Sequence, residues 1–90
     1  MDLNSKVVFS DAVFAQEVDG EMVLLDMGTE NYFGLDRVAG DIWKFLREGR
    51  TVGETYDALL EIYDVDPQRL KNDMETFLTA LLDSKLATLA

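Results

Sequence analysis

The residues of this chain that could hold a metal ion are carboxylates, because the sequence contains neither histidine nor cysteine. Asp64 and Asp66 lie one residue apart, a spacing that occurs in calcium-binding loops. The segment lacks the third acidic position and the glycine of such a loop, and Pro67 directly follows Asp66. An aspartate before a proline is typical of a helix start. We therefore expect Asp66 to cap a helix, and we expect no metal site.

Catalytic groups are equally scarce in the sequence. Without histidine or cysteine, the usual general base and the thiolate nucleophile are missing. The three serines, Ser5, Ser10 and Ser84, do not lie in a nucleophile-elbow sequence. The six glycines are scattered and do not form a phosphate-binding loop. We expect no catalytic residue and no cofactor, and hence a protein that is not an enzyme.

Charge and length limit the possible partners. The 90 residues carry a formal net charge of −10, with eighteen carboxylates against eight lysines and arginines. Proteins that bind nucleic acid gain much of their affinity by neutralising phosphates with cationic side chains, so a nucleic-acid partner is disfavoured. The N-terminus lacks the pattern of a signal peptide, and no apolar run approaches the ~20 residues that span a bilayer. We expect a cytoplasmic protein without a membrane partner.

Three short strand-like runs precede the helical part of the chain. Residues 1–11 are expected to form a lead-in, in which Val7 to Phe9 can form an early strand, and residues 12–90 a single domain. Val13 to Val18 and Met22 to Asp26 read as strands joined by Asp19-Gly20, a strong hairpin turn signal. A second turn around Gly28 leads to a third strand over 32–35.

From Asp36 the hydrophobic period changes from two to about 3.6, which predicts three helices. Asp36 is the expected N-cap of the first helix, and Gly49 stands where a helix end favours a left-handed residue. Thr51 and Glu54 match a capping box at the start of the second helix. Asp66 precedes the third helix, whose apolar stripe continues to about residue 84.

This order predicts an α+β domain that is winged-helix-like, with a three-stranded antiparallel sheet followed by three helices. In a meander, the first and third strands form the sheet edges. Residues 31–35 contain no lysine or proline to protect such an edge. An unprotected edge can accept an extended peptide as an additional strand, so peptide binding is the function that these residues favour.

Several motifs in register, over roughly residues 12 to 86, resemble the PqqD-like proteins. These motifs are Asp19-Gly20-Glu21, Val23-Leu24-Leu25-Asp26, Tyr32-Phe33-Gly34-Leu35, Ile42-Trp43, Thr51 with Glu54, Tyr63-Asp64-Val65, Pro67, Asp73, and Phe77-Leu78 with Leu81. PqqD-like proteins are recognition elements for the precursors of ribosomally made, modified peptides. The resemblance implies a stand-alone domain that binds the precursor's leader segment and presents it to a separate maturation enzyme.

The resemblance also implies the place of binding and the kind of partner. The leader is expected to add as a strand beside the third strand, in a groove that the third helix closes. The implied peptide-binding residues are Asn31, Tyr32, Phe33, Gly34, Leu35, Arg69, Leu70, Asp73, Met74 and Phe77. Within the family, overall resemblance favours lasso-peptide biosynthesis, in which the partner enzyme is a cysteine-protease-type leader peptidase.

Individual residues in this set keep more than one interpretation. Tyr32 and Phe33 point to opposite faces of their strand, so one approaches the leader and the other the core, in either order. Arg69 and Asp73 are four residues apart and can pair on the helix surface or meet leader side chains. Met74 and Phe77 share a stripe with core leucines, and Trp43 is expected in the core.

The position of one turn glycine differs from the family pattern. The family often has its glycine directly before the aromatic strand, whereas here Gly28 comes earlier. We therefore expect Asn31 to adopt the unusual backbone conformation in its place.

Three other functions remain alternatives at this point. One is a peptide chaperone for a radical enzyme in quinone-cofactor biosynthesis. From other classes, a winged-helix transcriptional regulator and a structural adaptor without a peptide ligand also fit the predicted fold. Duplex binding that falls steeply with salt would support the regulator.

Overall fold

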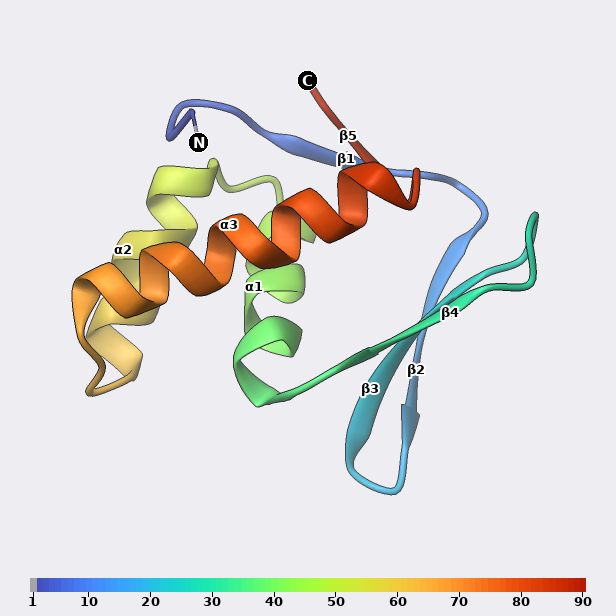
Figure 1. The fold of residues 1–90 in the computed structure, drawn as a ribbon, viewed down its shortest axis with the longest axis horizontal. Helices are drawn as coiled ribbons and strands as arrows, with labels where there is room; N and C mark the ends of the chain where they lie inside the picture. The colour runs from blue at the N-terminus through green and yellow to red at the C-terminus, as the bar shows by residue number, and fades with distance from the viewer. Residues whose placement is uncertain (1) are drawn as a thin grey trace.

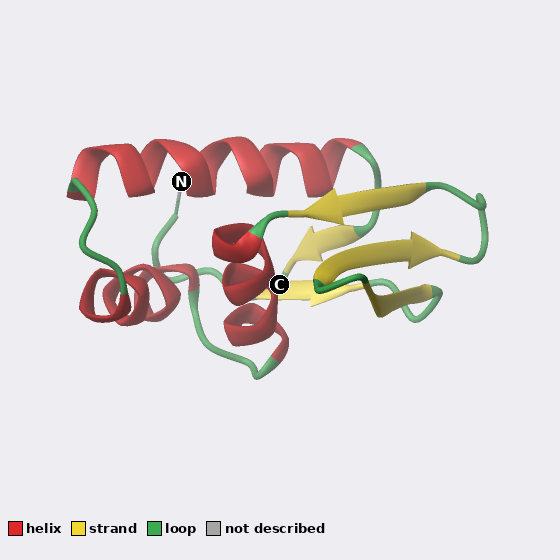
Figure 2. Cartoon of the chain, turned by 90° about the horizontal axis from the view of Figure 1, so that it is seen from below, coloured by secondary structure: helices red, strands yellow, loops and turns green. Residues whose placement is uncertain are grey.

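The computed structural model describes residues 2–90, which form two small sheets and three helices. Figure 1 shows their arrangement. The elements in chain order are β1 Val7–Phe9, β2 Val13–Val18, β3 Glu21–Asp26, β4 Tyr32–Leu35, α1 Arg37–Arg47, α2 Val52–Ile62, α3 Pro67–Asp83 and β5 Ala87–Leu89. The helices gather at one end of the molecule and the larger sheet projects at the other (Figure 2).

The predicted α+β class is confirmed. The structure has two strands in addition to the predicted three-stranded sheet, β1 before it and β5 after the three helices. β2, β3 and β4 form the expected antiparallel meander, with β2 and β4 at its edges. A second sheet pairs β1 with β5 across almost the whole chain, with Val8 opposite Thr88. β1 lies where the sequence indicated an early strand, at Val7 to Phe9, whereas β5, with three residues, is too short for a periodic pattern to predict. The winged-helix likeness stays a prediction.

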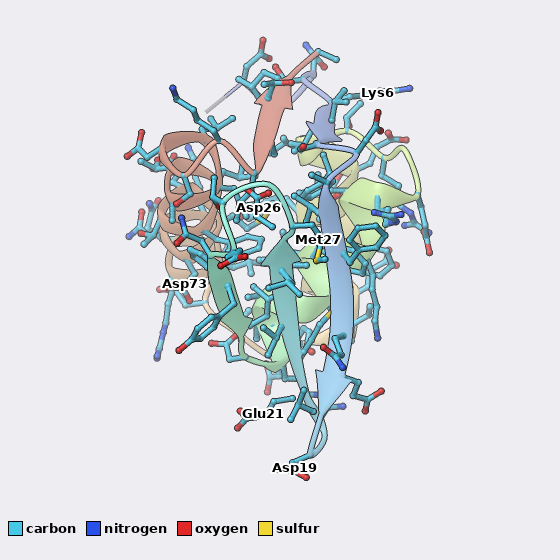
Figure 3. The ribbon with its side chains drawn as sticks, turned by 90° about the vertical axis from the view of Figure 1, so that its right-hand side faces the viewer. Lys6, Asp19, Glu21, Asp26, Met27 and Asp73 are labelled. Carbon is cyan, nitrogen blue, oxygen red and sulfur yellow. The ribbon has the colours of Figure 1, made fainter. Side chains whose placement is uncertain are left out.

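The hairpin between β2 and β3 turns at the residues that the sequence indicated. Asp19 has φ 51° and Gly20 has φ 82°, and Val18 pairs with Glu21 across the turn. Two successive positive φ angles define a type I′ turn, whose twist matches that of the flanking strands. Figure 3, which looks onto the sheet, shows Asp19 at the tip of this hairpin.

The turn between β3 and β4 differs from the prediction. Asp26, itself buried, organises this turn by accepting hydrogen bonds from the Gly28 N–H at 2.9 Å and from the Thr29 hydroxyl at 3.1 Å. The left-handed residue is Glu30, with φ 63°, so the expectation for Asn31 is wrong. The Asn31 carbonyl already accepts from the Asp26 N–H at 2.8 Å, and this bond places Asn31 in line with the β3–β4 ladder.

All three helices begin at the predicted caps. Asp36 accepts from the Ala39 N–H at 2.8 Å, and Asp66 accepts from the Gln68 N–H at 3.3 Å. Asp66 thus has a structural role, as expected. After α1, Gly49 adopts the predicted left-handed conformation, with φ 96°.

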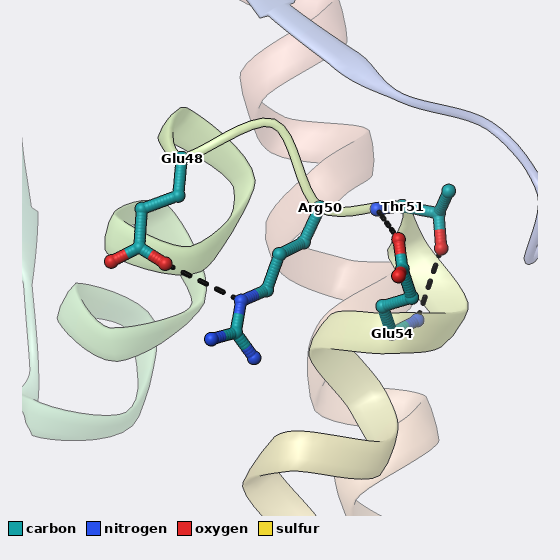
Figure 4. Close-up of polar contacts among 4 residues, drawn as sticks. All are labelled: Glu48, Arg50, Thr51 and Glu54. Carbon is teal, nitrogen blue, oxygen red and sulfur yellow. Dashed lines mark hydrogen bonds and ion pairs between the residues drawn. The ribbon is translucent and has the colours of Figure 1, made fainter.

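The start of α2 is a complete capping box (Figure 4). The Glu54 N–H donates to the Thr51 hydroxyl at 3.1 Å, and the Thr51 N–H donates to the Glu54 carboxylate at 2.9 Å. The hydrogen bond from the Thr51 backbone lowers the pKa of Glu54. Arg50 and Glu48 form an ion pair at 3.3 Å in the preceding loop, where exposure to water leaves it little net effect on stability.

The core lies between one face of the larger sheet and the three helices. Leu24 from β3, Ile42 from α1, Leu59 from α2, and Met74 and Leu81 from α3 are almost completely buried. Trp43, at 8% exposure, also belongs to the core as predicted. This packing fixes the position of α3 relative to β4, and it thereby shapes the groove described below.

Loss of the capping box should destabilise the fold measurably. Thr51→Ala removes the side-chain acceptor for the Glu54 N–H, which we expect to lower the free energy of unfolding by about 1 kcal/mol. Urea denaturation followed by circular dichroism measures the change. Thr51→Ser keeps the hydroxyl and should stay close to the wild type. Equal stability of the alanine and serine variants would contradict the contribution of the box.

Candidate functional site

A groove of about 800 Å³ lies between β4 and the first turns of α1 on one side and α3 on the other. The loop between α2 and α3 closes one end of it. Its lining residues are Phe33, Asp36, Val38, Ala39, Ile42, Tyr63, Asp64, Val65, Asp66, Arg69, Leu70, Asp73, Thr76, Phe77 and Ala80.

Five of the ten residues predicted for peptide binding line this groove. They are Phe33, Arg69, Leu70, Asp73 and Phe77. The groove thus joins the predicted strand and the predicted helix, which are more than thirty residues apart in the sequence. Peptide contact by these residues stays a prediction.

The other five predicted residues lie outside the groove lining. Leu35 and Met74 are buried in the core, so Met74 has the structural role that its stripe favoured. Asn31 is exposed in the turn that leads into β4. Tyr32 and Gly34 are exposed residues of β4 itself, where their side-chain positions alternate with those of Phe33 and Leu35.

The structure decides which of Tyr32 and Phe33 faces the groove. Phe33 packs edge-to-face against Phe77, with ring centroids 6.1 Å apart and an interplanar angle of 63°. This aromatic pair joins β4 to α3 at the base of the groove. Tyr32 is 77% exposed and points to the opposite face of the sheet. Phe77 is buried, so it serves the core as well as the groove.

The outer edge of β4 has no partner strand among residues 2–90. Hydrogen-bonded and non-hydrogen-bonded pairs alternate along an antiparallel ladder. The Asp26–Asn31 hydrogen bond fixes this alternation, so that the main-chain groups of Phe33 and Leu35 point toward β3. Those of Tyr32 and Gly34 consequently point to the open edge. β4 is also the strand nearest α3 (Figure 3), so this edge borders the groove.

The polar rim of the groove is mainly acidic. Asp36, Asp64, Asp66 and Asp73 supply four carboxylates, and Arg69 supplies one guanidinium. Arg69 and Asp73 are both exposed, and they do not form an ion pair in the described part of the chain. Both side chains are therefore available at the rim rather than tied to each other.

A polar contact that the sequence did not reveal supports the closed end of the groove. The Tyr63 hydroxyl donates a hydrogen bond to the Asp41 carboxylate, connecting the end of α2 to α1. This hydrogen bond, together with partial burial and the negative charge of Asp41, raises the pKa of Tyr63. Tyr63 was recognisable as the last member of the α2 apolar stripe, but its partner lies 22 residues away.

The groove residues contributed by α1 were also missing from the prediction. Val38, Ala39 and Ile42 line the groove because α1 begins directly after β4 and starts beside its edge. The short connection at Asp36 is the sequence signal that could have indicated them.

Neither a metal centre nor a membrane span is found in the described residues. Across residues 2–90, no three histidine, cysteine, aspartate or glutamate side chains lie close enough together to hold a metal ion. No helix in the same range is long and apolar enough to cross a bilayer.

Comparison with known proteins identifies the family. The family model described as coenzyme PQQ synthesis protein D, or PqqD, matches residues 21–87. The chain belongs to the PqqD family. The resemblance of the sequence motifs to PqqD-like proteins is thus confirmed. No curated protein matches the chain.

Two solved structures resemble this PqqD-family chain over most of their length. TbiB1, solved in complex with the TbiA(beta) leader peptide, is 41% identical, with a TM-score of 0.80 over 89% of this chain and 93% of TbiB1. Lasso peptide synthetase B1, solved in complex with the leader peptide, is 23% identical, with a TM-score of 0.83 over 92% of this chain and 98% of its own. The second likeness concerns the fold alone.

The Tyr63–Asp41 contact should be visible in an alkaline titration. Because the pKa of Tyr63 is higher in the folded state than its usual value, the contact stabilises the fold below about pH 10. That contribution is lost as the pH rises through the raised pKa. Tyr63→Phe should remove a late component, one that titrates above the usual tyrosine pKa, from the tyrosinate absorbance at 295 nm.

Asp41→Asn is the matched control for this titration, because it keeps an acceptor and removes the charge. It should shift the late component toward lower pH without abolishing it. A tyrosinate curve that is identical in wild type, Tyr63→Phe and Asp41→Asn, after correction for the number of tyrosines, would contradict the contact.

Proposed function

We propose that this protein binds the leader segment of a ribosomally synthesised precursor peptide as an added strand along β4. The observation that carries the proposal is the open β4 edge beside an apolar groove that α3 borders. TbiB1, which is 41% identical, was solved with a leader peptide. That similarity supports a leader as the peptide concerned.

The proposed binding mode divides affinity and specificity between two parts of the site. The N–H and C=O groups of Tyr32 and Gly34 form hydrogen bonds with the leader backbone. The affinity that these bonds provide does not depend on the leader sequence. Phe33, Leu70 and Phe77 accept alternate leader side chains in the groove and select among sequences. Such a complex has an affinity in the micromolar to nanomolar range, about −8 to −12 kcal/mol.

The role we propose is recognition rather than catalysis. The chain carries no histidine or cysteine, and the groove is lined mainly by apolar side chains and carboxylates, together with Tyr63, Arg69 and Thr76. The protein would hold the leader while a separate maturation enzyme acts on the precursor. We place this step in the cytoplasm, where ribosomal precursors are made.

Lasso-peptide biosynthesis is the pathway type that we favour, with a cysteine-protease-type leader peptidase as the enzyme partner. The 41% identity with TbiB1, together with the lasso peptide synthetase B1 fold, supports this choice. The family description favours a second candidate, a peptide chaperone for a radical enzyme in coenzyme PQQ synthesis. The two candidates differ in the leader that they require.

Fluorescence anisotropy with two labelled leaders separates these candidates. One leader comes from the small precursor gene nearest this one, and the other from a PQQ precursor. We expect saturable binding of the first and little binding of the second. The reverse order would favour the PQQ role, and failure of both leaders to bind folded protein would contradict leader recognition.

Paired substitutions at Gly34 test strand addition. Gly34→Pro removes an N–H that points to the open edge rather than to β3, and its ring occupies the space of an incoming strand. We expect this variant to weaken leader binding at least tenfold, as measured by anisotropy.

Gly34→Ala is the control for the proline variant. A Cβ built at position 34 meets no heavy atom within 4 Å, and alanine keeps the N–H, so leader affinity should remain near that of the wild type. Equal affinity of the proline and alanine variants, both folded by circular dichroism, would exclude strand addition at β4.

A further inference from the structure

The larger sheet has a second face, directed away from the helices, which we call the outer face. Its side chains alternate with those of buried residues such as Val13, Leu24 and Leu35. The outer face is formed by Phe14, Gln16, Val18, Glu21, Val23, Leu25, Tyr32 and Gly34.

The centre of the outer face is apolar, and no helix of residues 2–90 covers it (Figure 3). Phe14, Leu25 and Tyr32 form one row across the three strands, because Leu25 pairs with Phe14 on one side and Tyr32 on the other. Phe14 is 57% exposed, and Val23 continues the apolar surface in the next row. Figure 3 shows this sheet in front with the helices behind it. A contiguous apolar surface of this kind is typical of interaction sites.

The segment that forms the outer face carries negative charge only, although Lys6 and Arg47 line a pocket beside Phe14 at the β1 side of the sheet. Residues 7–36 contain seven of the eighteen carboxylates and none of the eight lysines and arginines. Asp19 and Glu21 lie at the end of the sheet near the β2–β3 turn (Figure 3), and Asp11 and Glu30 lie in the turns at the opposite end. In the described residues, none of these carboxylates forms an ion pair with a cation of the chain.

This charge pattern restricts what can cover the face. Nucleic acid and anionic lipid surfaces would be repelled. A second copy, packed face to face, would bring carboxylates against carboxylates, which is unfavourable where charges lose water. A different protein, with an apolar centre and a rim of lysine and arginine, complements both features.

We infer that the outer face, centred on Phe14 and Leu25, is the docking surface for the maturation enzyme. The enzyme contacts it through an apolar patch of its own, which is rimmed by basic residues. This inference rests on the proposed function, which supplies a separate enzyme as partner. The outer face and the groove are distinct, because Phe14 and Phe33 point to opposite sides of the sheet.

The outer face also continues into the proposed leader strand. A strand added at the β4 edge would extend the sheet beyond Tyr32 and Gly34, so that alternate leader side chains join the outer face. An enzyme docked there would contact this protein and the leader at once. Bound leader should therefore raise the affinity of the enzyme for the complex.

The test measures binding of the purified cysteine-protease-type leader peptidase encoded beside the precursor gene, by biolayer interferometry, with and without leader. Phe14→Ser should weaken peptidase binding at least about tenfold, as expected for a central apolar residue of an interface. Glu21→Lys should slow association and reduce its salt dependence. Leader affinity, measured separately by anisotropy, should be unchanged in both variants.

Two matched controls lie on α2, away from the sheet. Ile62→Ser removes an apolar side chain that is also 57% exposed, and Glu61→Lys reverses another exposed glutamate. Both should bind peptidase as the wild type does. Circular dichroism confirms that each variant is folded.

Several outcomes would overturn the inference. They are absence of peptidase binding to the wild-type protein with leader bound, wild-type binding by Phe14→Ser and Glu21→Lys, and equal losses in the α2 controls. A dimer in sedimentation velocity that Phe14→Ser abolishes would assign the face to a second copy instead. Failure of the leader to bind would contradict the proposed function alone, because peptidase binding without leader still reports on the outer face.

Discussion

The constraint on which the site depends is the set of unpaired main-chain groups along β4. In the described part of the chain, β3 satisfies one edge of this strand and no strand satisfies the other. Exposed N–H and C=O groups in a row are a template for another strand. The N–H and C=O groups of Tyr32 and Gly34 are directed to this edge, whereas Phe33 and Leu35 are bonded to β3 and turn their side chains toward the groove and the core. In the proposed binding mode, β4 therefore offers its main-chain groups to the leader backbone along one edge and the Phe33 side chain to leader side chains in the groove.

The rest of the fold keeps that edge open and in register. The Asp26 turn fixes which residues of β4 face β3. Asp36 caps α1 immediately after the strand, so the chain leaves the sheet without covering its edge. The contact between Phe33 and Phe77 holds α3 beside β4, while Met74 anchors the same helix in the core. α3 therefore borders the groove in a position that contacts with β4 and with the core hold fixed.

Local features of this protein were predictable from sequence, and contacts between distant segments were not. The Asp19 turn and the Thr51 cap depend on residues within three positions of each other, and both occur as predicted. The β1–β5 sheet joins the two ends of the chain, and the Tyr63 hydrogen bond spans two helices; neither leaves a periodic signal. Glu30 rather than Asn31 adopts the left-handed conformation because the hydrogen bond between Asp26 and Asn31 keeps Asn31 in register with β3. The direction of each side chain also depends on this register. The sequence therefore indicated ten candidate binding residues but not which of them line the groove.

Amide hydrogen exchange with and without the leader, resolved by residue in NMR spectra, tests the central claim most directly. The account predicts that leader binding strongly slows exchange of the Tyr32 and Gly34 amides, which point to the open edge. The Phe33 and Leu35 amides already bond to β3 and should change much less. Saturable leader binding that leaves the Tyr32 and Gly34 amides exchanging at their free rates would contradict strand addition along β4.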